Sequence, residues 1–394
     1  MTPAPTAAPL RIVWFGSYAV GPGYPRSETL IAGLRELGHE VVEVRAPLFA
    51  GAGERVAAGR GAGAARLAWR QLGAALRLAR GWFRVGDHHV VVAGSGGVAD
   101  TLLLRLLQNV ERRPLVHDAF VPLYDTVVRD RRLAAPESWR ARAVRALERV
   151  QARAADVVLC DTAAHAELLA ADTGVARERF APVPVCQADP GPPAPLPDVA
   201  PLRVLLVATY IPLHGVETVV EACARLRGDG VEVSVVGAGQ TLEAVRSRAA
   251  GVPGLTLVPE FRPPEEIAAR LAASHVGLGV FGDTAKAGRV VPLKAALVLA
   301  HGRALVTRDA APARAALGDA ALLVPPADPD ALAVALARLR DDRTLVARLG
   351  VAGRRLYEER FSPRAVAGAF LAALEERGLT PRRDEPGPSG PSSP

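Results

Sequence analysis

The sequence predicts an α/β protein with two Rossmann-like, doubly wound domains that face each other across a cleft. Short runs of Val and Leu alternate with helical stretches rich in Ala, Leu and Arg, which is the pattern of parallel sheets covered by helices. The length of 394 residues exceeds one ordinary core, and a composition that is 49% hydrophobic and 23% charged is typical of a globular chain.

A proline-rich segment at residues 186–203, CQADPGPPAPLPDVAPLR, divides the chain. Its prolines disfavour both a helix and a central strand, so we interpret it as an interdomain linker. The last residues are poor in apolar side chains and are expected to be disordered. The predicted parts are an N-terminal domain, a linker, a C-terminal domain, a C-terminal helix and a disordered tail, at residues 9–187, 188–202, 203–360, 361–378 and 379–394.

The same alternation of strand and helix is expected in both halves. Strands are predicted at residues 11–15, 41–45, 89–93, 114–117, 156–160, 203–208, 231–236, 255–258, 276–280, 304–307 and 321–324. Helices are predicted at residues 27–38, 97–108, 138–155, 162–172, 215–227, 240–249, 328–340, 343–357 and 363–377. Ser27 is the expected N-cap of the first helix, and Gly38 is its expected stop.

Ligands of doubly wound sheets bind beyond the carboxyl ends of the strands, so the loops after the strands are the candidate sites. The first loop, GSYAVGPGYPR, leads into a helix N-terminus that can hold an anion, although it lacks the GxGxxG dinucleotide fingerprint. The other loops are HDAF, ATYIPLHGVE, VGAGQ and FGDTAKAGRVVPLK, at residues 117–120, 208–217, 236–240 and 281–294.

The last of these loops carries Lys286, Arg289 and Lys294 and has no acid after Asp283. The two lysines are the only ones among 48 basic residues. A helix is expected to begin near Pro292, because proline suits a first turn. Three cations at a helix N-terminus predict a diphosphate site, and a solvated basic loop is the alternative.

The chain contains, in order, the motifs GHEV, ATYIPLHGVETVVEA, VSVVGAGQ, FGDTAKAGRVVPLKAALVLAHGRALVT and LLVPPADPDALAVAL. Together they resemble the family 4 retaining glycosyltransferases (glycosyl transferase group 1), which have the GT-B fold. The resemblance covers residues 9–378 and is strongest over 203–340. It implies transfer of a sugar, with retention and without metal or cofactor, from a nucleotide sugar bound by the C-terminal domain to an acceptor bound by the N-terminal domain. It also implies that the helix at 361–378 packs back on the N-terminal domain.

The resemblance further implies roles for individual residues. Arg289 and Lys294 would neutralise the departing diphosphate, and His117 and Asp118 would lie near the transferred sugar. The residues implied in donor binding are Gly21, Gly23, Thr209, His214, Gly215, Gly237, Gly239, Gln240, Thr284 and Lys286.

The sequence departs from the family pattern at three positions. The family commonly has a glutamate at each end of a nine-residue stretch, where this chain has Arg289 and Leu297, and a lysine in a PxxKG-like turn, where it has His214. The segment VVPLK is similar to a branch with a PNK-type turn that lacks some of these features. A catalytically silent GT-B partner protein and a nucleotide-sugar epimerase of the same fold are therefore the alternatives to a transferase.

The charge of the chain, +7 with a pI of about 9.9, favours an anionic small substrate or an anionic membrane surface. The basic residues are scattered and no nucleic-acid-binding motif is present in the sequence, so we expect no nucleic-acid partner. Residues 60–84 contain six arginines and no acid. They predict either an amphipathic helix at a membrane, with Trp69, Trp82 and Phe83 exposed, or the solvated face of a domain helix.

The expected acceptor is lipid-linked or a small-molecule glycan. Tyr124, Asp125 and Arg129 are candidates to line its site, with helix capping as the alternative. The sequence has no secretion signal and no apolar run near the roughly 18 residues of a membrane span, and its three cysteines show no metal-ligand spacing. We expect a cytoplasmic protein, peripheral at the inner face of the membrane if residues 60–84 bind lipid.

Overall fold

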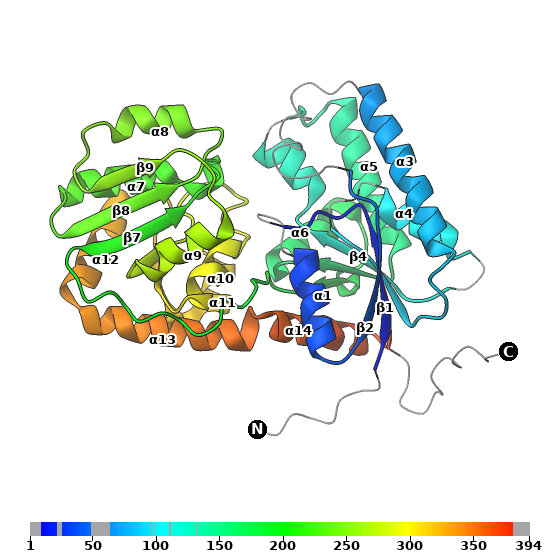
Figure 1. The fold of residues 1–394 in the computed structure, drawn as a ribbon. Helices are drawn as coiled ribbons and strands as arrows, with labels where there is room; N and C mark the ends of the chain where they lie inside the picture. The colour runs from blue at the N-terminus through cyan, green and yellow to red at the C-terminus, as the bar shows by residue number, and fades with distance from the viewer. Residues whose placement is uncertain are drawn as a thin grey trace. The chain divides into compact units, whose positions relative to one another are not determined.

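The computed structural model describes residues 9–21, 26–48, 64–95, 97, 99–109, 112–131 and 133–380. The chain divides into two compact units, the first formed by Met1–Pro184 with Pro363–Pro394 and the second by Val185–Ser362. Each unit contains one parallel sheet of six strands flanked by helices (Figure 1). The predicted α/β class, with two doubly wound sheets, is confirmed.

The sheet of the first unit has the strand order β2-β1-β3-β4-β5-β6. Its strands are β1 (Arg11–Gly16), β2 (Glu40–Arg45), β3 (Val90–Ala93), β4 (Leu115–Phe120), β5 (Val157–Cys160) and β6 (Phe180–Pro182). Its helices are α1 (Arg26–Glu36), α3 (Ala64–Trp82), α4 (Asp100–Leu107), α5 (Trp139–Ala154), α6 (Ala163–Thr173) and α14 (Pro363–Glu375), with a π-helical turn at Asp125–Asp130 and a 3₁₀ turn at Arg177–Arg179.

The sheet of the second unit has the order β12-β11-β10-β7-β8-β9. Its strands are β7 (Leu202–Val207), β8 (Val231–Val236), β9 (Leu255–Val258), β10 (Val276–Leu278), β11 (Ala304–Arg308) and β12 (Ala321–Val324). Its helices are α7 (Val216–Leu226), α8 (Leu242–Ala249), α9 (Pro264–Ala272), α10 (Leu293–Ala300), α11 (Ala311–Leu317), α12 (Pro329–Asp341) and α13 (Arg343–Arg360), with 3₁₀ turns at Pro212–His214 and Gly318–Ala320.

The strands form where the sequence has short, continuous apolar runs. All four residues of β3 (VVVA) and of β5 (VVLC) are buried, as expected for parallel strands covered by helices on both faces. Polar side chains cap α5 and α6: the Ser138 hydroxyl accepts a hydrogen bond from the amide of Ala141, and the Thr162 hydroxyl accepts one from the amide of His165, both at 3.2 Å. Buried strands and capped helices together position the loops at the carboxyl ends of each sheet.

The predicted N-cap of the first helix is wrong. Ser27 lies inside α1, which begins at Arg26, and its side chain is buried. The residue before it, Arg26, makes a long-range contact in which its guanidinium donates through Nε to both carboxylate oxygens of Asp118 at 2.9 and 3.0 Å. A basic residue that looks like a loop residue in the sequence is thereby held in the interior.

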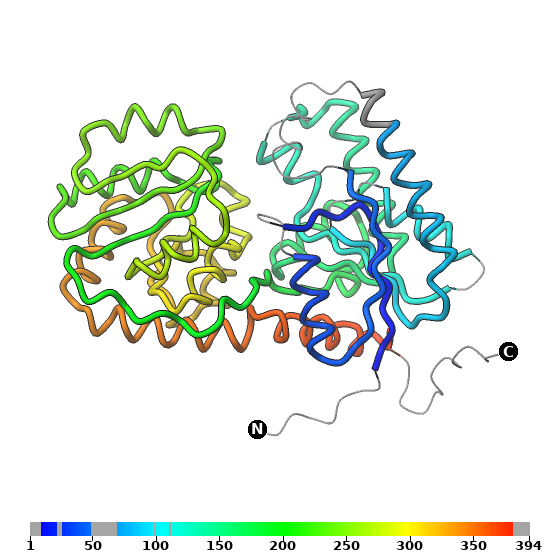
Figure 2. The backbone as a smooth tube through the Cα atoms, in the orientation of Figure 1, coloured from blue at the N-terminus to red at the C-terminus, as the bar shows by residue number. Residues whose placement is uncertain are grey.

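The C-terminal helix α14 belongs to the first unit, where it packs against α1 (Figure 2). The helices approach so closely that a Cβ atom on Gly33 would lie 1.9 Å from the carbonyl oxygen of Pro363. Phe370 of α14 meets the fully buried ring of Trp14, with ring centroids 6.3 Å apart. Helix α14 therefore contacts the face of β1 that carries Trp14.

Residues 186–201 of the proline-rich segment form no helix or strand, and side chains of the second unit bind this stretch at several points. The buried Arg303 guanidinium donates to the carbonyl oxygen of Ala194 at 2.9 Å, and the Tyr357 hydroxyl donates to that of Gln187 at 2.9 Å. His275 accepts from the amide of Arg203 through Nδ1, which leaves its other ring nitrogen to donate to the carbonyl of Pro197 at 2.9 Å. The segment therefore lies on the second unit as an ordered strap.

Helix α3 agrees in part with the predicted exposure of aromatic residues at 60–84. Trp69 and Phe83 are exposed, but Trp82 packs against the core with its ring edge-on to Phe15 at 6.2 Å. The predicted exposure of Trp82 is therefore wrong, because it lies on the side of α3 that carries the buried Leu78. Within the described part of the chain, no helix combines the length and apolar character needed to cross a bilayer.

Candidate functional site

Two loops at the carboxyl ends of strands in the second unit are joined backbone to backbone. The amides of Phe281 and Gly282, after β10, donate to the carbonyl oxygens of His214 and Leu213, after β7, at 3.0 and 3.2 Å. A Cβ atom on Gly215 would lie 2.4 Å from the amide nitrogen of Gly282, so glycine is required by close approach as well as by a φ of +59°. His214 is thereby fixed beside the loop at 281–294.

The glycine loop after β8 lies on the same loop after β7. A Cβ atom on Gly237 would lie 1.8 Å from the carbonyl oxygen of Ala208, and one on Gly239 would lie 1.9 Å from that of Thr209. The side chains of Thr209 and Gln240 are exposed at this edge of the sheet. The structure thus brings together the three loops that the sequence predicts for donor binding in this unit.

Lys294 occupies the second position of α10, and its ammonium group is buried without a hydrogen-bond partner. Burial away from water lowers its pKa from 10.5 to about 7. The alternative of a solvated basic loop does not fit this burial. An unpaired, buried amine at the carboxyl edge of a parallel sheet is a group that an anion would stabilise.

The His214 ring is buried and faces the same place. Its Nδ1 accepts a hydrogen bond from the amide of Thr209 at 3.0 Å, so the neutral ring carries its proton on Nε2. Burial, and then the nearby charge of Lys294, lower the pKa of His214 to about 2. His214 is therefore a neutral hydrogen-bond donor, whereas the lysine of the related motif would supply a charge.

The rest of the 281–294 loop is braced by a residue that the sequence does not single out. Arg308, at the end of β11, donates to the carbonyl oxygen of Gly282, and the Thr284 hydroxyl accepts from the amide of Ala287 at 3.1 Å. Lys286 and Arg289 are partly buried on the turn that follows. Lys286 and Arg289 lie on this loop and Lys294 in the first turn of the helix that follows it. The roles of Thr284, Lys286 and Arg289 at a diphosphate stay predictions.

In the first unit, a carboxylate fixes the start of the loop after β1. Asp100 accepts hydrogen bonds from the amide and the hydroxyl of Ser17 at 2.5 and 3.1 Å, and a Cβ on Gly16 would lie 2.6 Å from its Oδ2. Gly21 has a φ of +90° and open space beside it, whereas Gly23 lies outside the described residues. The approach of this loop to donor phosphates stays a prediction.

His117 and Asp118 stand side by side on β4 but have different surroundings. The side chain of Asp118 is completely buried against Arg26, which also donates to the carbonyl oxygens of Val183 and Pro184. His117 pairs with the hydroxyl of Thr101 at 2.7 Å, and burial lowers its pKa to about 4. This geometry favours a structural role for Asp118, while a role of His117 near the sugar stays a prediction.

The three candidates for the acceptor site belong to a network of charges around one ring. Arg129 forms two hydrogen bonds with Asp172 at 2.6 and 2.8 Å, and it also lies 3.6 Å from Asp125. The guanidinium groups of Arg129 and Arg145 lie 5.0 and 4.3 Å from the centroid of the Tyr124 ring. These contacts stabilise the Asp125–Asp130 turn, so neither acceptor binding nor simple capping is needed to account for them.

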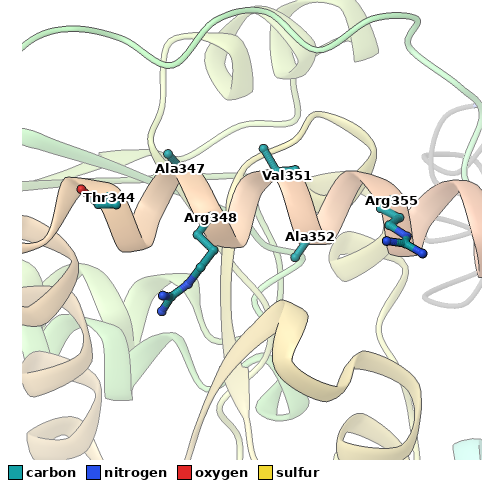
Figure 3. A pocket seen from close by; sticks show the side chains of 6 residues that line it. All are labelled: Thr344, Ala347, Arg348, Val351, Ala352 and Arg355. Carbon is teal, nitrogen blue, oxygen red and sulfur yellow. The ribbon is translucent and has the colours of Figure 1, made fainter.

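A shallow hollow lies along the exposed face of α13 (Figure 3). It is lined by Thr344, Ala347, Arg348, Val351, Ala352 and Arg355, all from this one helix. No strand end or glycine loop contributes to it, so it is not the candidate site. Among the described residues, no cluster of three or more His, Cys, Asp or Glu side chains could hold a metal ion.

Solved structures resemble this chain over nearly its whole length. Sucrose-phosphate synthase from Thermosynechococcus elongatus gives a TM-score of 0.68 at 17% identity and covers 93% of this chain and 98% of its own. The fold is GT-B. HepE of Anabaena in complex with UDP-glucose shares this GT-B fold with a TM-score of 0.65 at 13% identity, over 93% of this chain and 100% of its own.

A third GT-B structure, an α,α-trehalose-phosphate synthase (UDP-forming) from Burkholderia vietnamiensis, gives a TM-score of 0.64 at 13% identity, over 94% of this chain and 98% of its own. Residues 201–342 match the family described as glycosyl transferases group 1. This match includes the loops that follow β7, β8 and β10, and with them His214 and Lys294. No curated protein sequence matches the chain.

Proposed function

We propose that this protein is a glycosyltransferase that moves a sugar from a nucleotide-sugar donor to an acceptor with retention of configuration. The observation that carries the proposal is the buried, unpartnered ammonium of Lys294, which lies near His214 and the joined loops after β7 and β10. The group 1 match over residues 201–342 supports the reaction class. UDP is the first nucleotide to test, because the similar structures include a complex with UDP-glucose and a UDP-forming synthase.

The diphosphate of the donor would bind beside Lys294 and supply the negatively charged hydrogen-bond partner that its ammonium group lacks. The amine would donate to phosphate oxygens, and the Nε2–H of His214 would add a neutral donor. The N-terminus of α10 contributes a further partial positive charge. A departing nucleoside diphosphate is more negative than the same group in the sugar ester, so these fixed donors stabilise the transition state more than the bound donor.

We propose a front-side displacement without a protein nucleophile. The bond between the anomeric carbon and the diphosphate oxygen breaks while the acceptor hydroxyl attacks from the same face. The hydroxyl proton passes to the departing phosphate oxygen, so charge and atoms balance without a metal or cofactor. The proposed acceptor is lipid-linked or a small-molecule glycan, and Arg289 would complete the neutralisation of the leaving group.

A catalytically silent GT-B protein is the second candidate, because of the residue at position 297. Leu297 stands where the resembling family commonly has a glutamate, and an apolar side chain cannot accept hydrogen bonds from ribose hydroxyls. A protein of this kind would bind a nucleotide but would not turn over its sugar. An epimerase would consume the nucleotide sugar and return an isomer instead of a glycoside.

The test begins with thermal unfolding in the presence of UDP, GDP, ADP and dTDP. A true ligand at a hundredfold excess over its Kd adds about 2.7 kcal/mol to apparent stability. Turnover of the matching nucleotide sugars is then measured for the wild type, for Lys294→Ala and for the control Arg348→Ala on α13. We expect Lys294→Ala to lower turnover about a hundredfold, as for the loss of one preorganised donor, and Arg348→Ala to have no effect.

Three results would decide against the transferase. No shift with any nucleotide and no turnover would remove the nucleotide site altogether. A shift without turnover by the isolated protein would favour the silent partner, and an isomerised nucleotide sugar as the product would favour the epimerase.

A further inference from the structure

The face of α3 that points away from the core carries a stripe of large apolar side chains. Trp69 is 73% exposed, Leu72 and Leu76 are each 51% exposed, and Phe83, just past the helix end, is 79% exposed. Their spacing of three, four and seven residues places them on one side of the helix. Four neighbouring side chains of this size form a patch, which a monomeric protein rarely leaves in contact with water.

The orientation of this stripe is fixed by the opposite side of α3. Ala74 and Leu78 are buried in the core of the first unit, and Trp82 packs against that core beside Phe15. Turning the exposed stripe inward would therefore expose the residues that now hold the helix in place. The apolar stripe remains on the surface for as long as the unit is folded.

Arginines border the stripe on one flank. Arg77, Arg80 and Arg84 are exposed, and the sequence has no acid between Glu54 and Asp87. Among the described residues, none of these three guanidinium groups has an acidic side chain within 4.0 Å. An exposed helix face elsewhere in the chain looks different, because on α13 Arg355 pairs with Glu359 at 2.8 Å.

The neighbouring helices also expose large apolar side chains. α4 contacts both α3 and α5. Leu106 is exposed on α4 and Trp139 is exposed on α5. Arg140 places its guanidinium 5.6 Å from the centroid of the Trp139 ring. Exposed large apolar side chains therefore also occur on the two helices that follow α3 in the sequence.

We propose that the α3 stripe, defined as Trp69, Leu72, Leu76 and Phe83 with Arg77, Arg80 and Arg84, docks the protein on an anionic phospholipid surface. Apolar side chains would enter the boundary between headgroups and acyl chains, while the arginines would contact lipid phosphates. The excess of unpaired positive charge selects a lipid surface over an uncharged protein groove. The inference does not depend on the transfer reaction, because adsorption requires only this surface.

The experiment is co-sedimentation of the full chain with vesicles of phosphatidylcholine alone and with 30% phosphatidylserine or phosphatidylglycerol. We expect binding only when anionic lipid is present, and weaker binding at 0.5 M salt than at 0.1 M salt, because salt screens the attraction. Each arginine near an anionic surface contributes about fivefold, so Arg77→Gln/Arg80→Gln/Arg84→Gln should weaken partitioning about a hundredfold. Trp69→Ser/Phe83→Ser should also reduce binding at least tenfold.

The matched control is Val351→Ser/Arg355→Gln on the exposed face of α13, which should bind vesicles like the wild type. Circular dichroism and melting temperature report whether each variant is folded, and tight nucleotide binding by the same preparation checks the second unit independently. Equal binding to neutral and anionic vesicles, or no binding to either, would overturn the proposal. So would a dimer in sedimentation that Trp69→Ser abolishes, because a second copy would then cover the stripe, and so would tighter binding to single-stranded RNA than to vesicles.

Discussion

The burial of Lys294 gives nucleotide binding a pH dependence whose size can be worked out. With a pKa of about 7, Lys294 of the free protein is half protonated at pH 7 and about 3% protonated at pH 8.5. A bound diphosphate favours the charged amine, so binding at high pH must first take up a proton. The affinity should therefore fall about fifteenfold between pH 7 and pH 8.5. His214 does not contribute, because its pKa of about 2 keeps it neutral throughout.

Isothermal titration of UDP, or of whichever diphosphate gives the largest thermal shift, measures this directly. Titrations in two buffers with different ionisation heats should show uptake of about one proton per nucleotide at pH 8.5 and about half a proton at pH 7. The phosphate itself changes charge mainly near pH 6, below this window. Lys294→Arg keeps a charge at all these pH values and should give a flat profile. A flat profile for the wild type would refute the reasoning.

The burial of Lys294 also makes the free energy of unfolding depend on pH. The pKa of Lys294 is lower in the folded protein than its ordinary value of 10.5, so the unfolded chain binds more protons between about pH 7 and 10.5 and stability rises with pH across that window. Below pH 7 the full cost is present, at most about 5 kcal/mol from about 1.4 kcal/mol per pH unit. Because a flexible lysine relaxes toward water, we expect Lys294→Met to raise the free energy of unfolding by about 2 kcal/mol at pH 6 and by little at pH 10. Chemical denaturation at both pH values measures the difference.

Two further substitutions test the packing of each unit. Gly237→Ala places a methyl group 1.8 Å from the carbonyl oxygen of Ala208, so we expect a loss of about 2–4 kcal/mol together with weaker nucleotide binding; an unchanged urea midpoint would show that the two loops do not touch. Arg26→Ala leaves Asp118 buried and unpaired, which should cost about 3–5 kcal/mol, whereas Arg26→Ala/Asp118→Asn should recover part of it. Equal losses in the single and double variants would mean that no uncompensated charge is involved.

The strands could be predicted because each is a short apolar run bounded by Gly, Pro or a charge. The limits of β8 and β9, residues 231–236 and 255–258, agree with the expectation to the residue. β6 could not be predicted in this way, because it has only three residues, ends in a proline and forms as the edge strand that pairs with β5. The turn at Asp125–Asp130 depends on a distant partner, Asp172, which local sequence does not reveal.

The same contrast applies to the candidate site. The sequence identifies the loops around Gly237 and Lys294 because glycines and cations after strands are local signals. It does not reveal that the Lys294 ammonium is buried without a hydrogen-bond partner, because burial depends on contacts with segments distant in the sequence. It also does not reveal Arg308, which looks like an ordinary strand-end residue and acts through the carbonyl of Gly282. Properties set by contacts between distant segments require the structure.

The place of α14 has a consequence for the order in which the protein is made. Synthesis delivers β1 to β6 first, but the helix that covers α1 and Trp14 leaves the ribosome only after the whole second unit has been translated. Until then the nascent first unit carries an uncovered apolar surface, which includes the part of α1 around Gly33 that α14 later contacts. The second unit is continuous in sequence and has no such delay. A frameshift or premature stop near residue 360 would therefore damage the N-terminal half, although every codon of that half had been translated correctly.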